Sequence, residues 1–314
     1  MAKEYNEHFP VMKDEVISLA NIKSDSIVVD MTLGRAGHSS EFLKLIPNGH
    51  LYAVDQDINA ISYSQRALKE IADNFTLFQA KFSQAPIILN DTYNVNGADF
   101  IFYDLGVSSP QFDDPGRGFS YRYNSPLDMR MDQINNMTTA SEVVNRYEPS
   151  VLIKALYEYA DEKYAKQIVK NIVKHRKIKP IKTTFELVDI IKEAVPLKEQ
   201  HKDKHPAKKT FLAIRYLVNK EEDEILCGIP EGIRLLNSKG RLAVLTFNSY
   251  EDGLVKRLFK RFTSSICNNK YLPPEKKDID FKLVLKKPLE PSEKEIELNH
   301  RSKPAKLRVI ERIN

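Results

Sequence analysis

Three short apolar runs with the same sequence pattern constrain the fold of this chain more than any other feature. They occupy residues 27–30, 51–55 and 100–104, and each ends in an aspartate. A turn and a stretch with helical spacing follow the first two, which predicts repeated strand, turn and helix units. Such units build a parallel sheet whose strands share one carboxyl edge, where ligands bind. We therefore expect the turns after Asp30, Asp55 and Asp104 to meet at that edge.

The strand pattern stops near Gln111 and returns only at 241–247. Between them lie a loop rich in Gly, Pro, Asp and Arg and then lysine-rich helical patterns. Further strands are expected at 75–78, 281–285 and 305–310, the last two as a closing hairpin. We predict an α/β protein with a doubly wound, mostly parallel, Rossmann-like sheet. The sheet domain should comprise 1–110 and 211–314, with a helical domain inserted at 111–210.

The chain has 314 residues, more than the ~100–200 typical of one domain, which agrees with a sheet domain that carries an insertion. Neither an apolar leader nor an apolar stretch long enough for a membrane span occurs, so we predict a cytoplasmic protein. Cys227 and Cys267 lack CxxC spacing, and His201 and His205 lack further ligands, so no disulfide framework or metal site is predicted. A homodimer is left open.

The turn Gly34-Arg35-Ala36-Gly37-His38 follows the first predicted strand. Gly34 and Gly37 leave space for a nucleotide-like ligand, and Asp55 can accept hydrogen bonds from ribose hydroxyls. A GxGxxG dinucleotide fingerprint would need a third glycine, which is missing, so nicotinamide cofactors are disfavoured. S-adenosylmethionine carries adenosine without a pyrophosphate and fits the pattern better. The structural alternative is an ordinary glycine turn before a helix.

Asp104 closes the strand predicted at 100–104, residues 113–130 form a dense run of Gly, Pro, Asp and Arg, and further motifs follow along the chain. They are Asp104-Leu105-Gly106-Val107-Ser108-Ser109-Pro110-Gln111, Arg117-Gly118-Phe119-Ser120, Pro126-Leu127-Asp128-Met129-Arg130-Met131, Tyr159-Ala160-Asp161-Glu162-Lys163-Tyr164-Ala165, His205-Pro206-Ala207-Lys208-Lys209-Thr210-Phe211, Arg215-Tyr216-Leu217-Val218-Asn219 and Phe247-Asn248-Ser249-Tyr250-Glu251-Asp252. In these motifs the chain closely resembles the bacterial ribosomal small-subunit RNA cytosine-N4 methyltransferase family, also described as the cell-wall-cluster methyltransferase family. The resemblance runs from His8-Phe9-Pro10-Val11-Met12 to Ala305-Lys306-Leu307-Arg308.

This resemblance implies S-adenosylmethionine-dependent methylation of the exocyclic N4 amine of a cytidine in the decoding region of 16S rRNA. The partner would be that RNA or the small ribosomal subunit. Asp55 would hold the ribose hydroxyls, Phe82 would pack on the adenine, and Asp104 and Gln111 would border the methyl group. The full set of predicted cofactor residues is Gly34, Ala36, Gly37, His38, Asp55, Phe82, Asp104 and Gln111.

Methylation of this amine poses a chemical problem, because its lone pair is delocalised into the cytosine ring. An acceptor for its N–H groups would help to align the nitrogen with the methyl group. Asp104 is the first candidate for this acceptor or general base, and Asn248 is the second polar group, since each follows a predicted strand. The alternative for Asp104 is a role in cofactor orientation alone.

Basic residues are concentrated in the predicted insertion. Residues 151–210 hold fifteen Lys and Arg against eight Asp and Glu, a net charge of +7, whereas the whole chain carries +5. Such a segment suits the phosphates of RNA, although a solvated lysine-rich surface is the alternative. The predicted phosphate surface comprises Lys174, Arg176, Lys177, Lys179, Lys182, Lys208, Lys209 and Arg215, while Arg117 and Arg130 are expected nearer a flipped base.

The sequence departs from the family pattern at four positions. Ala36 replaces a glycine, Asn248 a histidine and Gly253 an arginine, and Pro304 interrupts the closing basic motif. An alanine would be strained in a left-handed conformation, and an amide cannot shuttle a proton at neutral pH. The alternative function is therefore a catalytically weakened RNA-binding or ribosome-assembly protein with the same fold. A DNA amino-methyltransferase is disfavoured, since Asp104-Leu105-Gly106-Val107 stands where an Asn/Asp-Pro-Pro-aromatic motif is expected.

Overall fold

The computed structural model describes residues 10–200, 205–264 and 279–314. His8, Phe9, His201 and Cys267, which the sequence analysis considered, lie outside these residues. The chain divides into two compact units, which we call the sheet unit (Met1–Gly106 with Glu224–Asn314) and the helical unit (Val107–Asp223). Their boundaries fall at 106 and 223, against 110 and 210 in the sequence analysis. Each unit is described on its own.

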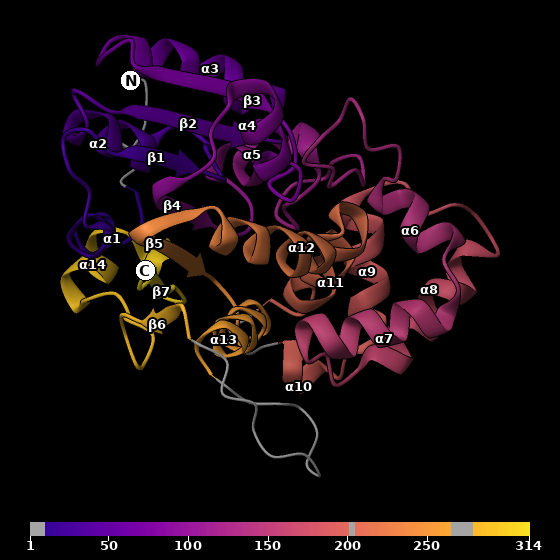
Figure 1. The fold of residues 1–314 in the computed structure, drawn as a ribbon. Coiled ribbons are helices and arrows are strands. Elements are labelled where there is room, and N and C mark those ends of the chain that lie inside the picture. Colours follow the sequence, from indigo (N-terminus) through magenta and orange to yellow (C-terminus); the bar gives the residue numbers. More distant parts are fainter. Residues whose placement is uncertain (1–9, 201–204, 265–278) are drawn as a thin grey trace. The chain divides into compact units, whose positions relative to one another are not determined.

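The sheet unit contains a seven-stranded sheet in the order β3-β2-β1-β4-β5-β7-β6 (Figure 1). Its first five strands run parallel, and β7 is antiparallel to both of its neighbours. The doubly wound, mostly parallel sheet is therefore confirmed. The strands are β1 Ile27–Asp30, β2 His50–Asp55, β3 Phe75–Gln79, β4 Ala98–Asp104, β5 Leu236–Thr246, β6 Phe281–Leu283 and β7 Lys306–Arg312.

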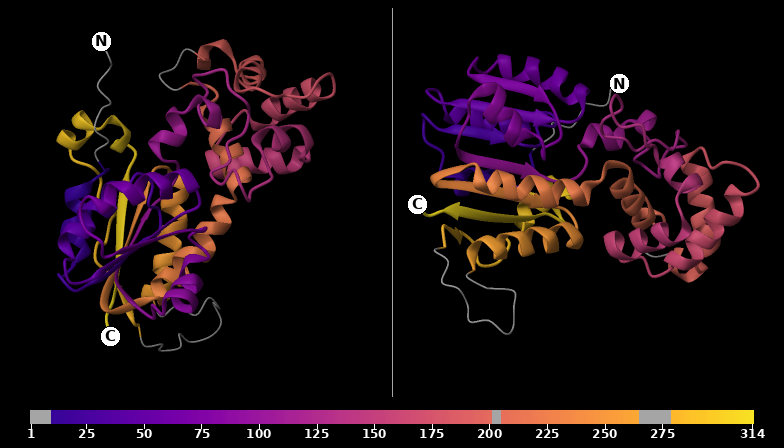
Figure 2. Two further views of the ribbon diagram at one scale, coloured as in Figure 1. Left: turned by 90° about the horizontal axis from the view of Figure 1, so that it is seen from above. Right: turned by 45° about the vertical axis from the view of Figure 1, so that its right-hand side comes forward.

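Both faces of the sheet are covered because the apolar side chains of the inner strands alternate between two cores. In β1, Val28 packs in one core and Val29 in the other. In β4, Phe100 and Phe102 likewise face away from Ile101. Figures 1 and 2 show the helices that cover the two faces. They are α1 Lys13–Ala20, α2 Gly37–Leu45 and α3 Ile58–Lys69 on one side, and α4 Ala85–Tyr93, α12 Glu221–Arg234 and α13 Ser249–Thr263 on the other.

Strand β5 begins earlier than its sequence suggests. The pattern predicted a strand from Arg241, whereas the structure starts it at Leu236. Leu236 lies opposite Ala98 and Arg241 lies opposite Phe100, so the polar residues between them form an irregularity in the strand. The closing strands pair antiparallel, as expected of a hairpin, with β6 shorter than predicted.

The helical unit has a core of its own, formed by residues such as Val143, Leu156, Ile168, Leu187 and Ile214. Its described residues contain no strand beyond an isolated bridge between Pro126 and Thr183. Its elements are α5 Ser109–Asp113, η1 Pro115–Arg117, α6 Ala140–Arg146, α7 Pro149–Ala160, α8 Ala165–Arg176, α9 Thr184–Ala194, α10 Leu197–Gln200 and α11 Lys208–Asn219. Two short helices of the sheet unit, α14 Glu293–Leu298 and η2 His300–Ser302, precede β7.

None of the helices within the described ranges combines the length and apolar character of a membrane span.

Candidate active site

Three aspartates end three adjacent strands at the carboxyl edge of the sheet. Asp30 ends β1, Asp55 ends β2 and Asp104 ends β4, and β1 lies between the other two. The chain order of the sheet reverses at β1 and β4, which creates the crevice where doubly wound sheets bind ligands. Burial raises the pKa of Asp30 and that of Asp55 to about 6. The edge therefore concentrates carboxyl groups that favour a cation or several hydrogen-bond donors.

The turn Gly34–His38 is fixed to this edge through its backbone. Gly34 has a φ of 51° and donates its N–H to Asp55 Oδ2 at 2.8 Å. Gly37 begins α2, and a Cβ at that position would lie 3.1 Å from Pro10 Cγ, so the glycine permits close approach of the chain. Ala36 has a φ of 59°, a left-handed conformation that strains an alanine. The alanine that replaces the family's glycine at this position therefore lowers the stability of the folded protein.

The Asp30 side chain accepts hydrogen bonds from residues on both sides of the Gly34 turn. Its carboxylate accepts the Thr32 N–H at 3.0 Å and the Ser39 hydroxyl at 2.6 Å. Thr32 in turn accepts the N–H of Asp104 at its Oγ1, at 2.6 Å. From the sequence, Asp30 was expected only to end a strand. Its signal was a buried carboxylate followed by hydroxyl side chains, a pattern that indicates local hydrogen bonds.

Asp104 carries the least satisfied polar atom of the site. Its Oδ1 is buried and accepts no hydrogen bond from the described residues, although the side chain as a whole is 30% exposed. Burial, followed by the nearby charges of Asp30 and Glu251, raises the pKa of Asp104 to about 8. A carboxyl group in this condition is suited to a donor, a cation or a proton that a ligand supplies.

His38 faces Asp104 with a defined tautomer. Its Nε2 lies 3.0 Å from the Val11 carbonyl oxygen, which only accepts, so Nε2 carries the proton. Its Nδ1, 3.8 Å from Asp104 Oδ2, then presents a lone pair to the carboxyl group. The ring is buried and lies against Phe102 at a centroid distance of 4.5 Å. Burial lowers the pKa of His38 to about 4, which keeps the imidazole neutral at physiological pH.

The other predicted site residues of the sheet unit have packing or capping roles in the structure. Phe82 follows β3 and packs edge-on against the Tyr103 ring at 5.4 Å. Asn248 is the N-cap of α13, where its Oδ1 accepts the Glu251 N–H at 2.9 Å, and Glu251 in return accepts the Phe247 N–H at 2.7 Å. Contacts of Phe82 with adenine and of Asn248 with substrate stay predictions.

Gln111 belongs to the helical unit and not to the sheet unit. Its Oε1 accepts the Ser108 N–H at 3.1 Å, as part of a capping box at the start of α5. A contact between Gln111 and the cofactor stays a prediction.

The predicted RNA-binding arginines are all engaged inside the helical unit. Arg117 is 7% exposed and donates to the carbonyls of Arg130 and Met131. Arg176 donates to two backbone carbonyls, and Arg130 and Arg215 form forked pairs with Asp128 and Glu221. These guanidinium groups brace loops and helix ends of the unit. The exposed lysines of the predicted surface are Lys174, Lys177, Lys179, Lys182, Lys208 and Lys209, of which Lys209 also donates to the Asp161 carbonyl and Lys179 pairs with Glu186.

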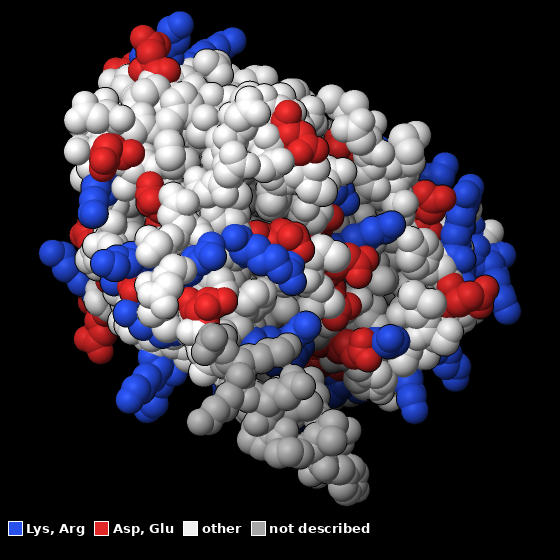
Figure 3. All heavy atoms as spheres, in the orientation of Figure 1, with Lys and Arg blue, Asp and Glu red and all other residues white. Residues whose placement is uncertain are grey.

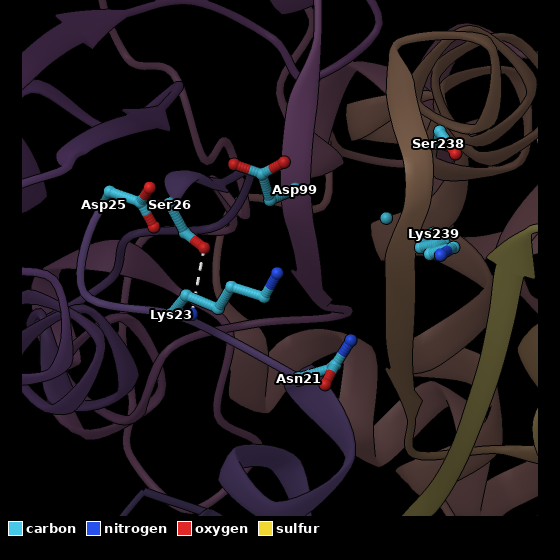
Figure 4. Close-up of a pocket in the computed structure, with 8 residues that line it drawn as sticks. Asn21, Lys23, Asp25, Ser26, Asp99, Ser238 and Lys239 are labelled. Atoms are coloured by element: carbon cyan, nitrogen blue, oxygen red, sulfur yellow. Dashed lines mark hydrogen bonds between the residues drawn. The ribbon is translucent and has the colours of Figure 1, made fainter.

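A polar pocket lies at the opposite, amino edge of the sheet (Figure 4). Ser26 directly precedes β1, and Asp99 lies at the start of β4, on the far side of the strands from the three aspartates. Because doubly wound sheets bind their ligands at the carboxyl edge, this pocket is not the cofactor site. Its lining residues are Asn21, Lys23, Asp25, Ser26, Asp99, Ser238, Lys239 and Gly240. Within the described ranges, no group of His, Cys, Asp and Glu side chains is arranged to hold a metal ion.

The carboxyl edge fits S-adenosylmethionine by the chemistry of its donors and acceptors. The backbone amides of Gly37 and His38 begin α2 and suit the carboxylate of an amino acid. Asp55 offers oxygens for ribose hydroxyls, and the unsatisfied oxygen of Asp104 suits a positively charged group. A seven-stranded sheet of this order, with an antiparallel seventh strand, together with these residues, defines a Rossmann-like methyltransferase that uses S-adenosylmethionine.

Comparison with known proteins identifies the family. The sequence profile of the MraW methylase family matches residues 5–313, and the chain belongs to this family. Proteins named ribosomal RNA small subunit methyltransferase H are similar over almost their whole length. The one from Mesoplasma florum is 46% identical over 98% of this chain and 99% of its own. Those from Mycoplasma capricolum and Mycoplasma mycoides are 47% and 48% identical, at the same two coverages.

Proposed function

We propose that this protein methylates the exocyclic N4 amine of a cytidine in the decoding region of 16S rRNA. Membership of the MraW methylase family and the names of its relatives support ribosomal RNA of the small subunit as the substrate. The observation that carries the proposal is the Asp104 carboxyl group, which has one buried oxygen without a partner among the described residues and stands beside the α2 turn. That group can accept a proton from an amine.

Different residues of the carboxyl edge bind the cofactor and transfer the proton. Asp55 buttresses the turn through Gly34 and offers its remaining lone pairs to ribose hydroxyls. Bound S-adenosylmethionine supplies a methyl group on a positively charged sulfur. Asp104 accepts an N–H of the target amine, which turns the nitrogen lone pair toward the methyl group, and it takes up the proton that the methylated amine releases.

His38 tunes the basicity of Asp104. A lone pair at Nδ1 disfavours an ionised carboxylate opposite it and favours a protonated one, which can donate to that nitrogen. The pKa of Asp104, raised to about 8, lies near neutral pH, where a general base is most effective. A positive charge at the cofactor would lower this pKa and ionise Asp104 when the reactants are in place.

The role of Asn248 as the N-cap of α13 bears on the alternative function. Because its Oδ1 caps α13 and an amide does not take up or release a proton at neutral pH, proton uptake would rest on Asp104. If Asp104 does not suffice, the protein is an RNA-binding or ribosome-assembly factor that retains cofactor affinity without product. The remaining parts of the proposal are the helical unit as the RNA-recognition domain, action in the cytoplasm and assembly as a homodimer.

Mass mapping of small-subunit RNA tests the proposal. RNA from a deletion strain should lack one methyl group on a cytidine, and complementation with the wild-type gene should restore it. An Asp104→Ala gene, expressed at an equal level, should not restore it. Full restoration by the Ala variant would remove Asp104 from any essential role, and an unchanged RNA in the deletion strain would contradict the proposed substrate.

A further inference from the structure

Helix α8 presents a row of lysines to solvent. Lys166, Lys170 and Lys174 follow one another at four-residue intervals, about 6 Å along the axis, and Lys177 follows three residues later, about 4.5 Å further on, so the four share one face. All four are exposed, while Ile168, Val169 and Ile172 bury the opposite face. Figure 3 shows Lys and Arg side chains, with some Asp and Glu side chains beside them, on the side of the helical unit that holds α8. We call these four residues the lysine row.

The lysine row is not neutralised by the protein. Helix α8 contains no acidic residue, and none of the four ammonium groups pairs with a carboxylate in the described residues. Lysines just beyond both ends do have such partners, because Lys163 lies 3.0 Å from Glu199 and Lys179 lies 2.8 Å from Glu186. A line of like charges without counter-charges is better suited to binding an extended polyanion than a solvated surface of mixed sign would be.

A loop with an exposed aromatic ring is hydrogen-bonded to the start of α9, the helix that follows α8 in the chain. Tyr123 is 46% exposed, and its neighbours Arg122 and Asn124 are exposed as well. The Thr184 hydroxyl donates to the Tyr123 carbonyl at 2.5 Å, and Thr184 and Ser125 are joined by further hydrogen bonds. These bonds fasten the loop to the start of α9, and only the segment 177–183 separates that point from α8.

We propose that the lysine row and Tyr123 together bind a single-stranded segment of RNA, with the phosphates along the row and a base stacked on the tyrosine. An aromatic ring on a preorganised loop is the feature that single-strand readers use, because unpaired bases expose their faces. Neither a duplex nor an acidic protein offers such a face together with regularly spaced charges. This inference rests on the proposed function for the identity of the polyanion, but it concerns binding and not methyl transfer.

Two double substitutions distinguish RNA binding by the lysine row from binding by positive charge elsewhere on the protein. Lys170→Gln with Lys174→Gln changes two lysines four residues apart on α8, and Lys256→Gln with Lys260→Gln changes a pair with the same spacing on α13. Binding of a fluorescein-labelled oligouridine is followed by anisotropy over a series of salt concentrations. The α8 pair should reduce the slope of log K against log salt by about 1.4, or ~0.7 for each lost phosphate contact. The α13 pair should leave the slope unchanged.

Tyr123→Leu should act differently from the lysine substitutions. It should weaken oligouridine binding about tenfold while the salt slope stays at the wild-type value, because stacking releases no counterions. Equal slopes for both lysine pairs, an unaltered affinity of Tyr123→Leu, or equally tight binding of duplex RNA would overturn the inference. Calorimetric titration with S-adenosylmethionine verifies that every variant is folded. Normal oligouridine results without any methyl transfer would defeat the proposed function and leave this surface standing.

Discussion

Asp104 ends β4 and His38 lies in the first turn of α2, and His38 Nδ1 lies 3.8 Å from Asp104 Oδ2. The imidazole is held by the Val11 carbonyl as a neutral ring and presents only a lone pair to the carboxyl group. Sequence alone could place Asp104 at a strand end and His38 in the turn before a helix. It could not show that the two face each other, because that depends on how β1 and β4 are paired and how the turn folds back.

Paired substitutions of His38 should separate its two nitrogens. His38→Gln can keep a donor for Val11 but removes the lone pair at Nδ1, whereas His38→Asn can keep a polar atom near Nδ1 but not the contact with Val11. We expect the acid limb of the pH profile of kcat/KM to move to lower pH in His38→Gln and to stay in place in His38→Asn, since loss of the lone pair favours ionised Asp104. Equal loss of kcat in both variants without any shift would indicate a purely structural role.

Replacement of Ala36 by glycine should increase the stability of the folded protein. Ala36→Gly relieves a left-handed alanine, worth about 1–2 kcal/mol, and loses a buried methyl group, worth about 0.8 kcal/mol. The net gain in the free energy of unfolding should be small and positive, up to about 1 kcal/mol, as measured by urea denaturation. Methyl transfer should be retained. A loss of more than about 1 kcal/mol would mean that the methyl group packs better than its backbone suggests.

At the scale of elements, the strands that end in Asp30, Asp55 and Asp104 could be predicted because continuous apolar runs that precede a turn have few other solutions. The early start of β5 could not, since the residues Asn237–Gly240 are polar and read as a turn. The arginines of the helical unit show a similar limit. Sequence displays their charge, but the partners that occupy Arg117, Arg176 and Arg215 are set by tertiary structure.

Helix α13 gives a prediction for Asn248. Asn248→Ala should lower the free energy of unfolding by about 1 kcal/mol, because it removes the N-cap, while Asn248→Asp should preserve stability. Thermal and urea unfolding of both variants measure this effect. If the role is only a cap, kcat should be close to the wild-type value in the Asp variant. A large drop in kcat with normal stability would show that the amide acts on the substrate.

At the scale of the whole molecule, the domain bounds 110 and 210 stay predictions, and the second boundary between the two units of the structure lies at 223. That boundary falls within α12, where the helix continues from Asp223 to Glu224 without a break. Helical periodicity carries no mark where a helix passes from one unit to another. The closing strands were easier to predict, because the alternation of apolar and charged residues at 305–310 is typical of a strand with one buried face.

The stability of the cofactor-free protein should fall as the pH rises from about 6.5 to about 8. Folded Asp104, with its pKa raised to about 8, holds a proton that the unfolded chain has already lost at this pH. Asp30 and Asp55, with pKa values of about 6, act in the same direction at lower pH, whereas His38, with its pKa lowered to about 4, opposes them only below about 6.5. Thermal melts of Asp104→Asn should lack most of this decline. An equal decline in the variant would assign it to other groups.

Transfer of a labelled methyl group tests the central claim most directly. Purified protein is incubated with S-adenosylmethionine labelled in its methyl group and with small ribosomal subunits from a strain that lacks the gene. The account predicts that label enters the RNA at the N4 position of one cytidine, and that Asp104→Ala binds the cofactor but transfers little of it. Cofactor binding by the wild-type protein without label in the RNA would contradict the account.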